Sequence, residues 1–225
     1  MVIDDLGQEA NSRQIELRDH NSLRHGSYGK NEMPSCFLLP QNGEEGPDPH
    51  TVKIGKEAFG HVGVHSVKYL FYCLDQAHSN DSNANYEPVR GLQQRLRHVD
   101  TQDFAITVIR RFLKGLWLEC QEQGVLKNAA RITMILTFPN TWSSKMTEWY
   151  ETILRKAWEA APIEEVCFIH ESEAIAHCGF HHQSHTLARN QTSKIVFCDL
   201  GGHTMVSSAL RYASGYLMGV RETNG

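Results

Sequence analysis

A short stretch near the end of the chain, DLGGHT at Asp199–Thr204, contains residue types that can bind the phosphate of a nucleotide. Glycine reaches positive φ without steric cost and has no Cβ, so Gly201 and Gly202 can point successive N–H groups into one anion site. Asp199 can hold hydrated Mg²⁺, which prefers one or two carboxylates and keeps most of its waters, and Thr204 adds a hydroxyl. A β-hairpin with a glycine turn explains the same residues without any ligand.

The elements around this stretch are predicted to be strands. Ile195–Cys198 and Thr204–Tyr212 flank the turn, and Tyr216–Val220 follows as a third strand. Upstream, Ile132–Phe138 and Glu165–Ile169 have the apolar composition of buried strands. Each of the three runs Ile132–Phe138, Glu165–Ile169 and Ile195–Cys198 is apolar on both faces, and helix-length segments separate them. We therefore expect the three strands to share one sheet.

Helices are predicted between these strands. Thr101 is expected to cap a long helix, with apolar residues at helical spacing, that ends at Gly124. Ser143 or Ser144 caps a second helix that runs to about Ala160. The alternation of strand and helix, followed by a hairpin, indicates an α/β domain.

The N-terminal part of the chain has weaker patterns. Residues 1–32 are mostly polar and show no clear periodicity, so this segment is expected to be weakly ordered. Met33–Leu39 and Thr51–Ile54 predict short strands, and Lys56–Val62 predicts a turn of helix.

Composition narrows the class of protein. The chain has 225 residues, of which 40% are hydrophobic, enough for a core. Its 22 basic and 26 acidic residues are nearly balanced, so we expect neither nucleic acid nor a membrane as a partner. The start, MVIDDLGQEA, is not typical of a signal peptide, and a cytoplasmic location is expected. The six cysteines are scattered, without C-x-x-C, which favours reduced thiols over disulfides.

Three segments together resemble a known family: ILTFPNTWSSKMTEWYETILRKAW, FIHESEAIAHCGF and IVFCDLGGHTMVSSALRYASGYLMGVRETNG. The family is the ATPase domain of the seventy-kilodalton heat-shock (DnaK-type) chaperones, particularly its divergent fungal branch, and the resemblance covers about Met33 to Gly225. Thr137–Pro139 is similar to the family's strand ending in T-x-P, and Glu171 to its Glu before a helix of small residues. The family's D-x-G-G-G-T loop is matched by Asp199, Gly201, Gly202 and Thr204.

The resemblance implies an actin-like (ribonuclease H-like) ATPase fold, with residues 33–192 in the first lobe and residues 193–225 starting a truncated second lobe. It implies ATP and Mg²⁺ as cofactors, with Asp199 holding the metal through water. Glu171 would orient or deprotonate the water that attacks the γ-phosphoryl group. Gly201, Gly202, His203 and Thr204 would contact phosphate oxygens. Glu171 and Asp199 should then converge at one sheet edge, within about a ligand's width.

Several positions depart from the family pattern. His203 stands where the family has a third glycine, and Phe59 stands where it has a lysine. Val2–Glu9, the candidate for the first phosphate loop, lacks the threonines, and the segment that grips adenosine is expected beyond Gly225. We therefore expect weak ATP binding with weak or absent hydrolysis. The alternative is a non-enzymatic remnant that acts as a protein-interaction module.

Two further alternatives stay open. Glu171 is equally typical of a carboxylate that stabilises the start of a helix. His177, His181 and His185 are spaced four apart, and on a helix they could ligate zinc. Gly179 and the polar residues after it favour a solvated loop instead.

Overall fold

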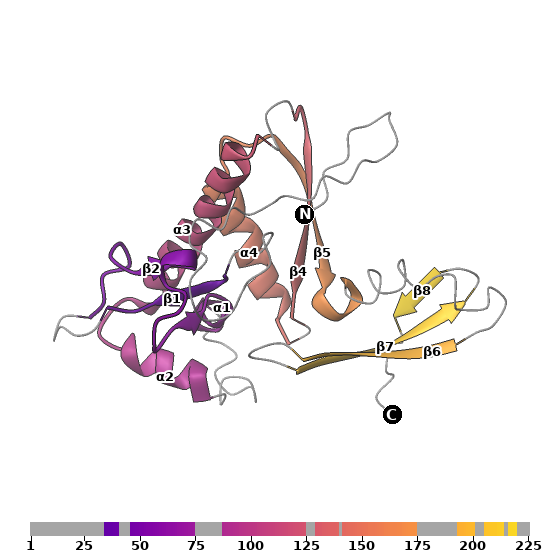
Figure 1. Ribbon diagram of the computed structural model, residues 1–225, viewed down its shortest axis with the longest axis horizontal. Helices are drawn as coiled ribbons and strands as arrows, with labels where there is room; N and C mark the ends of the chain where they lie inside the picture. The colour runs from indigo at the N-terminus through magenta and orange to yellow at the C-terminus, as the bar shows by residue number, and fades with distance from the viewer. Residues whose placement is uncertain are drawn as a thin grey trace. The chain divides into compact units, whose positions relative to one another are not determined.

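The computed structural model describes most of the chain between residues 34 and 174, and three strands beyond it (Figure 1). The described residues are 34–40, 46–74, 87–124, 129–139, 141–174 and, for the backbone only, 193–200, 205–213 and 216–219. The segment expected to be weakly ordered, residues 1–32, lies outside them. The chain divides into two compact units, Met1–Met134 with Ser143–Val166, and Ile135–Trp142 with Cys167–Gly225.

The longest helix of the first unit is α3 (Thr101–Glu122). Its N-cap is Asp100 rather than the predicted Thr101, and the Asp100 carboxylate accepts hydrogen bonds of 3.0 Å from the second and third helical N–H groups. A carboxylate here satisfies two orphan donors and also suits the positive end of the helix. Gly124, with φ of 67°, follows the helix end as predicted. The helix buries one stripe, Phe104, Ala105, Val108, Ile109, Phe112, Leu113, Trp117 and Cys120.

Helix α4 (Ser144–Ala157) packs against α3. Its N-cap is Ser143, one of the two predicted serines, and the Ser143 hydroxyl accepts a hydrogen bond of 3.3 Å from the Met146 N–H. The helix ends before the predicted Ala160 because Trp158, its C-cap, leaves the helical conformation at φ −112° and ψ 32°.

Trp158 joins the two helices. Its ring is 3% exposed, its Nε1 donates a hydrogen bond of 2.8 Å to the Leu113 carbonyl, and its centroid lies 5.0 Å from that of Trp117. A buried indole N–H needs an acceptor, and here the acceptor belongs to the neighbouring helix. The pair therefore fixes how α4 lies on α3.

Strands β4 (Ile132–Phe138) and β5 (Ile163–His170) form a two-stranded sheet, and α4 connects them (Figure 1). The Ile132 N–H donates a hydrogen bond of 2.9 Å to the Pro162 carbonyl, so the two strands start side by side and run in the same direction. Burial alternates along β4, and Ile135 is 46% exposed. The expectation that both faces of this strand are buried is wrong, because one face alone enters the core.

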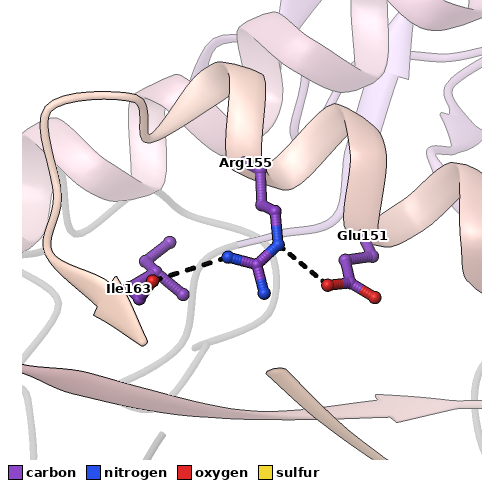
Figure 2. Close-up of polar contacts among 3 residues, drawn as sticks. All are labelled: Glu151, Arg155 and Ile163. Carbon is purple, nitrogen blue, oxygen red and sulfur yellow. Dashed lines mark hydrogen bonds and ion pairs between the residues drawn. The ribbon is translucent and has the colours of Figure 1, made fainter. Parts of the chain in front are cut away.

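The turn between α4 and β5 is bridged by Arg155 (Figure 2). Its Nε lies 2.8 Å from Glu151 Oε1 one helical turn earlier, and its Nη1 lies 3.5 Å from the Ile163 carbonyl at the start of β5. Exposed ion pairs of this kind contribute about 0.3–0.5 kcal/mol. The bridge therefore orients the turn more than it stabilises the unit.

The N-terminal strands form a second small sheet in the order β2-β1-β3, with antiparallel pairing. Their bounds are β1 Cys36–Leu38, β2 Lys53–Ile54 and β3 His65–Ser66, and the 3-10 turn η1 spans Gly55–Glu57. The two strands predicted in this region are thus confirmed in shortened form. Arg111 of α3 donates hydrogen bonds to the Pro49 carbonyl and, over 3.1 Å, to the Val52 carbonyl. This guanidinium ties the loop before β2 to the long helix.

Two helices of the first unit have no counterpart in the sequence prediction. Helix α1 (Lys68–Leu74) is buried at five of its seven residues, so no polar face shows a helical period. Helix α2 (Glu87–Arg95) contains Pro88 and Gly91, which read as breakers, and buries only Val89 and Leu92. Proline is tolerated in the first helical turn, because the N–H groups there have no intrahelical acceptor.

The second unit contains an antiparallel sheet in the order β6-β7-β8. Its strands are β6 (Ser193–Leu200), β7 (Met205–Ala213) and β8 (Tyr216–Gly219), which confirms the three strands predicted there. Among the described residues β6 pairs with β7, whereas β4 pairs with β5, so the expectation of one shared sheet is wrong. A four-residue connection makes the β6–β7 hairpin local, whereas a parallel β5–β6 pairing requires a long crossover.

Taken together, these elements make the chain an α/β protein. In the part of the chain that the structure describes, no helix is long and apolar enough to cross a membrane. Four cysteines lie in the described side-chain region, Cys36, Cys73, Cys120 and Cys167, and all four are free thiols, as the spacing predicts.

Candidate functional site

The DLGGHT stretch lies between two paired strands. Asp199 is the penultimate residue of β6 and pairs with Val206 of β7, and Leu200 pairs with Met205. Gly201, Gly202, His203 and Thr204 connect the two strands and lie outside the described residues. The predicted position of the stretch, between two successive strands, is therefore confirmed by the pairing of β6 with β7, and its phosphate contacts stay a prediction. Either a glycine hairpin or an anion-binding turn fits such a connection.

Glu171 follows the last residue of β5. The backbone is helical over residues 171–174, Glu171 is half-buried, and Ser172 beside it is 2% exposed. The strand-to-helix transition predicted here is confirmed. A carboxylate at this position can stabilise the helix start or act on a ligand beyond the strand end. The structure brings Glu171 to the carboxyl end of one strand and Asp199 to the carboxyl end of another. Convergence of their carboxylates stays a prediction.

Aromatic rings gather at the carboxyl ends of β4 and β5. Phe138 lies with its ring centroid 6.0 Å from that of Phe168, edge to face at 83°, and 4.3 Å from that of His170, tilted by 42°. All three residues are half-buried and belong to the second unit. Sequence reasoning missed this cluster. The sequence did contain a signal for it. Phe168 and His170 are two residues apart in a strand, so they lie on the same face, and Phe138 ends the neighbouring parallel strand.

The position matched to the family's lysine is Phe59, just after η1. Phe59 is half-buried, and the nearby Lys56 ammonium lies 3.8 Å from a carboxylate oxygen of Glu119. The Lys56 ammonium near this position thus forms an ion pair with Glu119 of α3. Nothing at Phe59 can supply the positive charge that phosphoryl transfer uses.

The histidines weighed as zinc ligands, His177, His181 and His185, lie outside the described residues. Within the described part, no group of three or more histidine, cysteine or acidic side chains could hold a metal ion. Burial raises the pKa of the Cys73 thiol to about 12 and that of Cys36 to about 11. Such thiols remain protonated and unreactive near neutral pH.

Comparison with known proteins adds no family to this description. No family model matches the chain, and a search of curated proteins gives no match.

Proposed function

We propose that the chain is a nucleotide-binding protein in which the Asp199–Thr204 turn holds the phosphates of Mg-ATP. The observation that carries the proposal is the position of the stretch: Asp199 is the penultimate residue of strand β6, and Gly201–Thr204 make the short connection to β7. A carboxylate at a strand end, followed by two glycines and a hydroxyl residue, supplies the groups that a magnesium–phosphate ligand requires.

The finer fold that we propose is actin-like, as the resemblance to DnaK-type chaperones suggests. The parallel pair β4 and β5, joined by α4, supports this proposal, as does the hairpin that follows in the chain. In α/β sheets, ligands bind beyond the carboxyl ends of strands. Glu171 and Asp199 both occupy such ends, which is where a γ-phosphate and its metal would lie.

Affinity is expected to be modest. Phosphate would be held by a few N–H groups, one hydroxyl and one metal-linked carboxylate, and His203 adds a Cβ and a ring where a third glycine would leave space. Each hydrogen bond to a charged group contributes about 1.5–3 kcal/mol, before the cost of association is subtracted. We expect a Kd for Mg-ATP weaker than about 1 μM.

Hydrolysis is expected to be near background. In the proposed site Glu171 would orient or deprotonate a water, and phosphoryl transfer also needs cations that stabilise the developing charge. Phe59 at the family's lysine position removes one such cation, and Lys56 lies against Glu119. Binding without efficient turnover is therefore the function that these residues support best.

Calorimetric titration of the whole chain with Mg-ATP tests the proposal. Asp199→Asn keeps the size of the side chain but removes the charge that holds hydrated magnesium, so it should weaken Mg-ATP binding at least tenfold. Glu148→Gln is the matched control, because Glu148 is an exposed carboxylate in α4. It should bind like the unmodified chain.

Two more variants separate the causes of weak binding. His203→Gly should tighten binding if crowding by the imidazole is the main defect. Glu171→Gln should leave Mg-ATP affinity unchanged and lower any residual turnover. A chain that shows no heat of Mg-ATP binding up to millimolar concentrations would instead support the non-enzymatic alternative.

A further inference from the structure

Three exposed arginines lie close together in the first unit: Arg90 and Arg95 in α2, and Arg97 just after that helix. Helix α2 lies at the periphery of this unit (Figure 1). Among the described residues, none of the three arginines forms an ion pair with a carboxylate. The acids nearest in the sequence are Glu87, which opens α2, and Asp100, whose carboxylate already accepts two helical N–H groups. The three arginines, called the arginine surface below, therefore present positive charge to solvent.

Two of these guanidiniums are held in place by histidines. Arg97 Nε donates a hydrogen bond of 2.7 Å to Nε2 of His98, and Arg95 Nη1 lies 3.4 Å from Nε2 of His65 in β3. An imidazole nitrogen that accepts from a guanidinium carries no proton, so these contacts do not cancel the positive charge. Each guanidinium also keeps further N–H groups that can donate to another acceptor. Side chains oriented in this way lose less entropy when a ligand binds.

The backbone fixes the spacing of the arginine surface. The apolar side chains that hold this segment to the core are fully buried: Val89, Leu92 and Leu96. The Leu96 N–H donates to the Leu92 carbonyl over 3.0 Å, so helical turning continues past the end of α2. Arg90 and Arg97 are therefore about two helical turns apart on the same side, roughly 10 Å along the axis. In an extended chain, side chains two or four residues apart project from one face at about 7 or 13 Å, which brackets this spacing.

We propose that the arginine surface is a docking site for an extended acidic segment of a partner protein, whose Asp or Glu carboxylates bind the guanidiniums. A guanidinium and a carboxylate can pair through two parallel hydrogen bonds, which gives this contact its geometric specificity. The inference is independent of the proposed nucleotide site, because every residue that carries it belongs to the first unit.

Nucleic acid and membranes fit this surface less well. The arginines cover only about two helical turns, and the 26 acidic residues of the chain outnumber its 22 basic ones, so a long polyanion is repelled elsewhere. Membrane association through a helix requires an apolar face that enters the bilayer. In α2 the valine and the leucine are fully buried against the rest of the unit instead.

Fluorescence anisotropy of labelled hexaglutamate, titrated with the whole chain, tests the proposal. The peptide should bind at about 20 mM salt and dissociate as salt is raised to about 0.5 M, because exposed charge pairs are screened. The triple variant Arg90→Gln, Arg95→Gln and Arg97→Gln should lower the affinity about tenfold. The same three positions changed to lysine keep the charge but lose the planar fork, so affinity should be intermediate.

The matched control is the triple variant Arg110→Gln, Lys114→Gln and Lys145→Gln. These cations are exposed in α3 and α4, so the control removes the same net charge from other surfaces of the chain. Its affinity for hexaglutamate should fall less than about twofold, since only general attraction is weakened. Both triple variants should melt at the temperature of the unmodified chain. If the arginine triple variant melts lower, the single variant Arg90→Gln should still weaken binding about twofold.

Three outcomes would overturn the inference. The unmodified chain could fail to bind hexaglutamate at low salt. The arginine and control triple variants could lose affinity equally, which would reduce the binding to general electrostatic attraction. An oligothymidylate of similar charge could bind more tightly than hexaglutamate and be lost in the arginine triple variant, which would make nucleic acid the ligand of this surface.

Discussion

Replacement of Trp158 by phenylalanine should destabilise the first unit by removing the bond between α4 and α3. The indole is 3% exposed, and its Nε1 donates to the Leu113 carbonyl over 2.8 Å. Loss of that hydrogen bond is expected to cost about 1 kcal/mol. The ring atoms that phenylalanine lacks add about 1–2 kcal/mol of lost burial. The free energy of unfolding should therefore fall by about 2–3 kcal/mol.

Urea denaturation followed by far-ultraviolet circular dichroism measures this change without depending on tryptophan fluorescence. Trp149→Phe, on the same helix at a half-buried position, is the control and should cost well under half as much. Trp117→Phe removes the same atoms from the other ring of the pair but leaves the bond to Leu113 intact, so the difference from Trp158→Phe reports the hydrogen bond. Equal stability of the Trp158→Phe and Trp149→Phe variants would refute the packing argument.

Other measurements address single contacts of the first unit. Arg111→Ala should lower the free energy of unfolding by about 1–3 kcal/mol, because two loop carbonyls lose their hydrogen-bond donor. Arg111→Lys should recover only part of the lost stability, and urea denaturation midpoints measure both changes. Burial, and then the charge of Arg95, lowers the pKa of His65 below 6.5. As the pH falls, His65 therefore takes up a proton more readily in the unfolded chain than in the folded chain. The urea midpoint of unfolding should drop between pH 7 and pH 5.5, and it should drop less steeply in His65→Phe. Burial raises the pKa of Cys73 to about 12, so mass spectrometry should find it alkylated by iodoacetamide far more slowly in the native chain than in urea.

The elements that could be predicted from the sequence are those whose pattern of apolar residues agrees with the face that they bury in the structure. Helix α3 has one apolar stripe and a glycine end, and β4 is a short apolar run closed by Pro139, so both patterns fix their own boundaries. Helix α1 could not be predicted, because burial on several sides erases its period. The pairing of the strands could not be predicted either. Whether β6 pairs with β7 in a local hairpin or with β5 through a long crossover depends on the tertiary structure.

Part of the candidate site could likewise be predicted. Asp199 near the end of β6 directly follows the apolar run Ile195–Cys198, and Glu171 is separated by one residue from the run that ends at Ile169. The buried Nδ1 of His170 could not be predicted, because its environment depends on the ring of Phe138 on a different strand. A sequence shows where a strand ends, whereas the packing decides which polar atoms are left without a partner.

The amide resonances of Gly201 and Gly202 offer the most direct test of nucleotide binding, since both N–H groups are proposed to contact phosphate. In a titration of the ¹⁵N-labelled chain with Mg-ATP, these two resonances should shift progressively and saturate. They should move much less with Mg²⁺ alone or in the Asp199→Asn variant, because the carboxylate then no longer positions the metal and its phosphate. If both amides stay unshifted up to millimolar Mg-ATP, or if shifts occur only elsewhere in the chain, the turn does not bind phosphate.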